Sequence, residues 1–110
     1  MGKFDGLSQF DGMRLGFVDV DSSTHSTSDT DAILSVSYTG TGAVTITLQS
    51  ANVAAGRVLV IKDAGGNATT NNITVNTQGS ETIDGAASAS ITSDDGVLRL
   101  YSDGTNWFVW

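Results

Sequence analysis

Alternation of apolar and polar residues is the feature that most restricts the fold of this chain. Residues 33–39 (ILSVSYT) place Leu, Val and Tyr at every second position, and residues 44–49 (VTITLQ) do the same with Val, Ile and Leu. A period of two is typical of β-strands that have one buried face. Thr, Val and Ile favour such strands, while Gly, Asn and Asp supply the turns between them. The sequence therefore predicts an all-β protein.

Further strands follow from short apolar stretches between turn residues. The Gly-Thr-Gly of residues 40–42 predicts a hairpin turn. Residues 58–61 (VLVI) are contiguous and apolar, which predicts a central strand covered on both faces. About eight short strands at this spacing are typical of a sandwich or small barrel. We expect eight or so short antiparallel strands that form a β-domain over residues 32–110.

The last nine residues, SDGTNWFVW, predict a tight turn followed by a closing strand. In a strand, Trp107 and Val109 point to one face while Phe108 and Trp110 point to the other. Both faces are apolar, and chain ends usually fray unless they are held. We therefore expect one face to join the domain core and the other to contact a neighbouring subunit.

The first 31 residues differ from the rest of the chain. Phe-Asp-Gly occurs twice, at residues 4–6 and 10–12, and a Ser/Thr-rich stretch follows. The simpler interpretation is a pair of Asp-Gly turns. The alternative is that residues 1–31 form an extended N-terminal attachment arm, too short and Gly-rich to build a core of its own. Its apolar anchors would be Phe4, Leu7, Phe10, Met13, Leu15 and Phe17.

Charge and composition exclude several classes of function. The formal net charge is -7, and only five residues are Lys or Arg, so no basic patch is available for nucleic acid or for an anionic membrane surface. The chain has no cysteine, which excludes disulfides and thiolate chemistry. No apolar run is long enough to span a bilayer, and the first residues do not resemble a signal peptide.

Residues suited to catalysis or metal binding are few. His25, the one histidine, lies in a Ser/Thr-rich stretch and is expected to be a solvated loop residue. Asp19, Asp21, Asp29 and Asp31 form an acidic group, but the stretch lacks the Gly and Glu of an EF-hand loop. A calcium site between subunits stays open as an alternative. We expect no enzymatic activity and no cofactor, and a small Asp/Ser hydrolase is the least favoured reading.

The chain from residue 28 to residue 110 resembles a β-rich module of structural proteins in tailed phages and related viruses, found in fibres and other surface components. The recurrent elements of that module are matched by Asp31 with Ile33, and by residues 44–48, 56–57, 61–63, 66–68, 72–74, 82–85 and 102–107. The resemblance implies an all-β unit that is oligomeric, often trimeric, and not an enzyme. Trp107 belongs to the recurrent ending, which implies a core position. Phe108 and Trp110 are then the expected subunit-interface residues.

From this resemblance and the short chain we expect a virion structural protein at the virion surface. A homotrimeric capsid decoration or cement protein fits best, anchored through its arm to the major capsid protein or another virion protein. The alternative is a tail-fibre or receptor-binding tip that binds a host-surface glycan. The same fold can serve either site.

Overall fold

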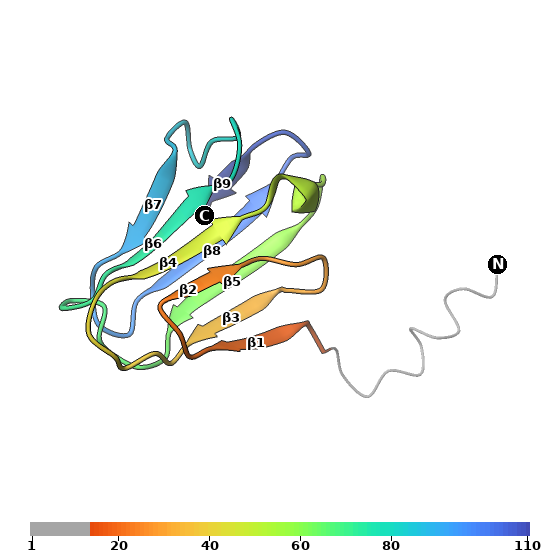
Figure 1. The fold of residues 1–110 in the computed structure, drawn as a ribbon. Coiled ribbons are helices and arrows are strands. Elements are labelled where there is room, and N and C mark those ends of the chain that lie inside the picture. The colour runs from red at the N-terminus through yellow and green to blue at the C-terminus, as the bar shows by residue number, and fades with distance from the viewer. Residues whose placement is uncertain (1–13) are drawn as a thin grey trace.

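The computed structural model describes residues 14–110 as a small all-β fold (Figure 1). This part of the chain contains nine strands and one short 3₁₀ helix. The elements are β1 (Phe17–Val20), β2 (Thr24–Ser26), β3 (Ile33–Val36), β4 (Val44–Leu48), η1 (Ser50–Asn52), β5 (Val58–Asp63), β6 (Ile73–Thr77), β7 (Ser88–Ile91), β8 (Val97–Ser102) and β9 (Trp107–Val109). The predicted all-β class is confirmed.

The strands form two mixed sheets that are not closed into a barrel. Sheet A has the order β1-β3-β5-β8-β9, and sheet B has the order β2-β4-β6-β7. From β1 to β6 the chain alternates between the sheets, and each strand lies parallel to the strand before last. These six strands are therefore three turns of a two-sided coil. The antiparallel pairs between strands are β5 with β8, β6 with β7 and β8 with β9.

The prediction of an antiparallel arrangement is wrong for the coiled part. The predicted hairpin at residues 40–42 is wrong for the same reason, because β3 lies in sheet A and β4 lies in sheet B. The Gly-Thr-Gly segment carries the chain from one sheet to the other. Alternation shows which face of a strand is buried, but it does not show which strand lies beside it. Two strands joined by a crossing between sheets therefore show the same alternation of apolar and polar residues as two strands joined by a hairpin.

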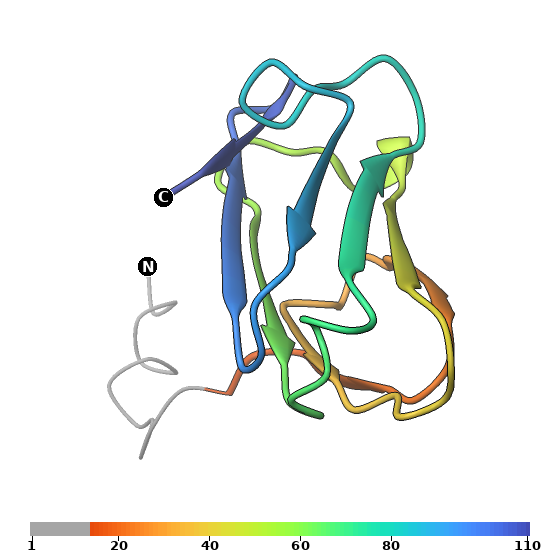
Figure 2. The same ribbon diagram turned by 90° about the vertical axis from the view of Figure 1, so that its left-hand side faces the viewer.

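The core lies between the two sheets, whose inner faces oppose one another in Figure 2. Alternate residues of both sheets point into it, including Leu34, Ile46, Leu59 and Val75, each fully buried. Trp107 joins them at 1 % exposure. The core position expected for Trp107 is confirmed.

The hairpin between β8 and β9 agrees with the turn predicted from the sequence. Gly104 has φ +98°, a conformation that a residue with a Cβ rarely adopts. The Asp103 carboxylate accepts hydrogen bonds from the backbone N–H groups of Thr105 and Asn106, both at 2.9 Å. These two bonds fix the turn and set the direction in which β9 returns along β8.

The β-domain begins earlier than the expected boundary at Ala32. Strands β1 and β2 belong to the two sheets, and Val20 at the end of β1 is only 2 % exposed. The structure therefore differs from the prediction that all of residues 1–31 form an extended arm. A parallel partner is distant in sequence, so the polar stretch around β2 carried no local sign that it would pair. Among residues 14–110, no helix has the length and apolar character needed to cross a membrane.

Candidate functional site

The outer face of sheet A carries most of the exposed large apolar side chains of residues 14–110. Strand β5 is the central strand of this sheet, as predicted, but only one of its faces is covered. Leu59 and Ile61 are buried, whereas Val58 is 40 % exposed. The apolar residues that share the outer face through the strand register are Phe17, Ile33, Val58, Val60, Val97, Tyr101, Phe108 and Trp110. We call this set the apolar face.

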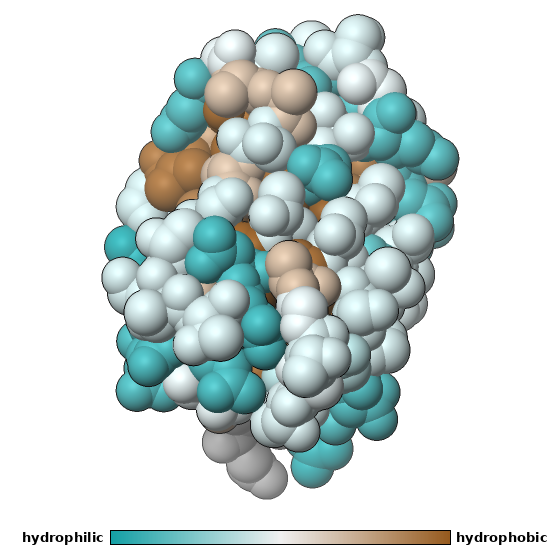
Figure 3. Space-filling model, turned by 60° about the vertical axis from the view of Figure 1, so that its left-hand side comes forward, coloured by the Kyte–Doolittle hydropathy of each residue, from teal (hydrophilic) through white to brown (hydrophobic). Residues whose placement is uncertain are grey.

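Exposed apolar side chains are concentrated on this face. Seven large hydrophobic residues of the described chain are exposed, and five of them belong to the apolar face. The outer face of sheet B differs, because its outward positions carry small polar residues: Thr24, Ser26, Thr45, Thr47, Thr74, Asn76, Ser88 and Ser90. Seen from the side of β7, the surface is mostly hydrophilic, with apolar colour confined to separate patches (Figure 3). A concentration of exposed apolar side chains on one face indicates an interaction site.

The residues predicted for a subunit interface lie together on the apolar face. The rings of Tyr101 and Phe108 stack with centroids 5.3 Å apart, and Trp110 lies 5.9 Å from Tyr101. The Arg99 guanidinium lies 5.8 Å from the Trp110 ring, and its Nε donates a hydrogen bond to the Trp110 carbonyl at 3.1 Å. These contacts hold Trp110 in place while leaving it 51 % exposed. Tyr101 and Arg99 were not expected here, although their alternation with Leu98 and Leu100 was a signal.

The expected arm anchors divide into two groups. Phe4, Leu7, Phe10 and Met13 lie outside the described residues. Leu15 and Phe17 are 48 % and 64 % exposed, and Phe17 begins β1, opposite Ile33. Phe17 therefore lies on the apolar face, at the edge of sheet A opposite to Phe108 and Trp110. One expected arm anchor, Phe17, therefore shares a surface with the expected interface residues Phe108 and Trp110.

His25 is not the solvated loop residue that its sequence context suggests. It lies in β2, half-buried, with Nε2 2.8 Å from Oδ2 of Asp31. Burial raises the pKa of Asp31, but hydrogen bonds with His25 and Ser28 outweigh that effect and lower it. The Ser28 hydroxyl also donates to Asp31 rather than to the histidine. This order of contacts differs from a Ser-His-Asp relay, where the histidine stands between the other two.

The Gly-rich segment after β5 is organised by Asp63. This carboxylate is 3 % exposed and accepts hydrogen bonds from the backbone N–H groups of Gly66, Ala68 and Asp95 at 2.9 to 3.1 Å. Burial raises the pKa of Asp63, and these backbone donors more than compensate, so the pKa is lowered. The N–H groups that could otherwise bind a phosphate are directed to the protein's own carboxylate.

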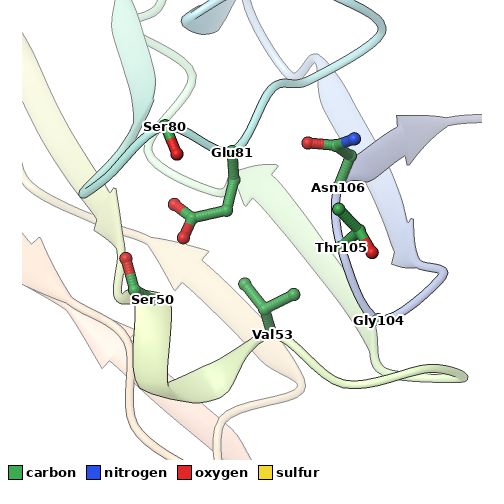
Figure 4. Close-up of a pocket in the computed structure, with 7 residues that line it drawn as sticks. All are labelled: Ser50, Val53, Ser80, Glu81, Gly104, Thr105 and Asn106. Atoms are coloured by element: carbon green, nitrogen blue, oxygen red, sulfur yellow. The ribbon is translucent and has the colours of Figure 1, made fainter.

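A polar pocket opens at the end of the molecule where η1 meets the β8–β9 hairpin (Figure 4). Its volume is about 360 Å³. The residues that line it come from three separate segments: Ser50, Val53, Ser80, Glu81, Gly104, Thr105 and Asn106. Figure 4 shows the Glu81 side chain extending into the space between Ser50 and the hairpin. Sequence reasoning missed this pocket.

Two further findings bear on the chemistry of these sites. Within residues 14–110, no three side chains of the His, Cys, Asp and Glu types gather closely enough to hold a metal ion. In comparisons with known proteins, no family model matches the chain, and no curated protein is significantly similar to it.

Proposed function

We propose that this protein is a virion structural protein, a homotrimeric capsid decoration or cement protein at the virion surface. The observation that carries the proposal is the apolar face, of which Phe17, Val58, Val97, Tyr101 and Trp110 are exposed. An isolated domain rarely leaves such a surface in water. The resemblance of the sequence to a phage structural module gives the class of assembly.

In the proposed trimer, each copy turns its apolar face toward a common axis. Tyr101, Phe108 and Trp110 form an aromatic group near one edge of that face, and aromatic residues and arginine are enriched in interface cores. The polar outer face of sheet B remains in water. A second copy is the preferred occupant because the five exposed apolar residues of this face outnumber its three charged residues, Asp19, Lys62 and Arg99.

Attachment to the shell is assigned to the segment that precedes β1. Phe4, Leu7, Phe10 and Met13 are its proposed apolar anchors, with the major capsid protein or another virion protein as partner. Leu15 and Phe17 are reassigned from the arm to its junction with the domain, since β1 belongs to sheet A. A deletion that tests the arm must therefore stop before β1.

Two measurements test the proposal. Sedimentation equilibrium of the purified full chain should give three times the chain mass of 11.4 kDa. Antibody labelling of purified virions should place the protein on the shell, and replacing the four arm anchors by serine should abolish that labelling while the trimer persists. A stable monomer would refute the trimer, and labelling that is unchanged in the serine variant would refute the arm.

A second candidate function is a tail-fibre or receptor-binding tip. It is favoured by the polar pocket, which is separate from the apolar face and is open to solvent. Labelling at the tail in place of the shell would support this candidate over the first.

A further inference from the structure

The polar pocket has walls that the fold holds in position. The Ser50 N–H donates to Oε1 of Gln78 at 2.9 Å, which ties η1 to the β6–β7 connection. On the opposite wall, the Thr82 N–H donates to Oδ1 of Asn106 at 2.9 Å. Asp103 anchors the backbone of Thr105 and Asn106. A site whose walls are already ordered loses little entropy when a ligand binds.

Glu81 supplies a fixed negative charge to the pocket. The Ser50 hydroxyl and the Gly79 N–H, which lies 3.1 Å from Oε1, both donate hydrogen bonds to this carboxylate and lower the pKa of Glu81. A Cβ at position 79 would lie 2.8 Å from the Ser50 oxygen and 3.2 Å from Oε2 of Glu81, so a side chain there would displace these two groups. The charge is thus both maintained and oriented.

Several other polar groups around the pocket are not used within the protein. The hydroxyls of Ser80 and Thr105 and the amide nitrogen of Asn106 form no hydrogen bond with another residue of the described chain. Together with Glu81 they offer both donors and acceptors. One apolar side chain, that of Val53, completes the lining.

We propose that this pocket binds a neutral saccharide unit. Neighbouring hydroxyls of a sugar ring can donate to the Glu81 carboxylate and accept from Asn106, Ser80 or Thr105, while a C–H face of the ring contacts Val53. Pockets of about 300–1,000 Å³ are typical for small ligands, and this volume of about 360 Å³ fits a single sugar unit. Glu81 and the net charge of -7 disfavour anionic ligands.

This inference deepens the receptor-binding candidate, but it depends on neither the trimer nor the location in a virion. Its experiment therefore measures binding by the isolated full chain. Failure of virion labelling leaves it intact, and failure of sugar binding leaves the apolar face and the proposed trimer intact.

The test is a titration of the ¹⁵N-labelled full chain with glucose, galactose, mannose and N-acetylglucosamine, followed by NMR. At least one sugar should produce saturable shifts of the backbone amides of Ser80, Glu81, Thr105 and Asn106. Glu81→Ala should weaken the affinity for that sugar about tenfold or more, as expected for the loss of a charged hydrogen bond. Asp21→Ala removes another exposed carboxylate, outside the pocket, and should leave the affinity unchanged.

Three results would overturn the proposal. The first is the absence of saturable shifts with all four sugars up to their solubility limits. The second is an equal loss of affinity in Glu81→Ala and Asp21→Ala. The third is a titration in which methylammonium shifts the pocket amides and no sugar does, because the pocket would then be a cation site.

Discussion

Trp107 is the largest side chain in the core, and its indole nitrogen is buried without a hydrogen-bond partner among residues 14–110. An unsatisfied buried N–H costs about 1–3 kcal/mol, so packing of the ring must outweigh that loss. Position 107 therefore requires the volume and shape of an aromatic ring more than it requires a hydrogen-bond donor.

Substitutions at Trp107 should separate these two contributions. Trp107→Ala should lower the free energy of unfolding by about 3–5 kcal/mol, because it leaves a large cavity. Trp107→Phe should cost clearly less, since it keeps an aromatic ring and removes the unsatisfied N–H. Urea unfolding followed by circular dichroism measures both values. Equal losses of unfolding free energy in the two variants would contradict the conclusion that position 107 mainly requires an aromatic ring.

Trp110 lies on the opposite face of the same terminal segment and should behave differently. Trp110→Ala should change the free energy of unfolding by no more than about 1 kcal/mol, because the side chain is 51 % exposed. The same substitution should shift the sedimentation mass from trimer toward monomer. Val109→Ala is the matched control, being apolar, exposed and adjacent, but absent from the apolar face. A large loss of unfolding free energy with an unchanged sedimentation mass would show that the two faces are reversed.

Asp31 should make stability depend on acidity. The pKa of Asp31 in the folded chain lies below its ordinary value of 3.8. The ionised Asp31 carboxylate therefore contributes to the free energy of unfolding above pH 3.8, and this contribution is lost as the pH falls through the lower pKa of the folded state. Asp31→Asn should remove part of the decrease in unfolding free energy between neutral pH and about pH 3. Asp21→Asn, an exposed control, should retain that decrease. If Asp31→Asn lost as much unfolding free energy over this pH range as the unaltered chain, the proposed contribution of Asp31 to stability would be refuted.

At the scale of elements, the sequence showed where most strands lie but not how they pair. Alternation marked β3 and β4 because each has one face in the core. It could not show that β3 pairs with β1 and β5, since parallel neighbours are separated by a crossing into the other sheet. Strand β2 was missed because its outward residues and His25 are polar. The sequence pattern of buried residues therefore does not determine the order of the strands in a sheet.

The integration of β1 into sheet A predicts a sharp limit for N-terminal truncation. Removal of residues 1–13 should leave cooperative unfolding and its midpoint nearly unchanged, because both sheets remain. Removal of residues 1–20 should lower the free energy of unfolding by several kcal/mol, since it exposes Leu34 and eliminates the buried Val20. Thermal unfolding of both truncated chains measures the difference. Similar midpoints for both would contradict the pairing of β1 with β3.

For the whole molecule, the two candidate sites differed in how far the sequence could predict them. Alternation in the last strand predicted that Phe108 and Trp110 share a face, and the core position that the resemblance implies for Trp107 made that face the expected outer one. The polar pocket could not be found in this way, because Ser50, Glu81 and Asn106 come from three distant segments that only the folded coil brings together. Alternation along one strand predicts which of its residues share a surface. A pocket built by several elements can be predicted only when the arrangement of those elements is known.

The coiled path of β1 to β6 also has a consequence for how such a chain can change length. Each turn adds one strand to each sheet and returns the chain to the same direction. A duplicated turn inserted between β4 and β5 would continue both sheets without reversing either face, as in solenoid proteins. A chain lengthened in this way would grow in steps of one turn, and its apolar face would widen while the closing strands β7, β8 and β9 stayed the same.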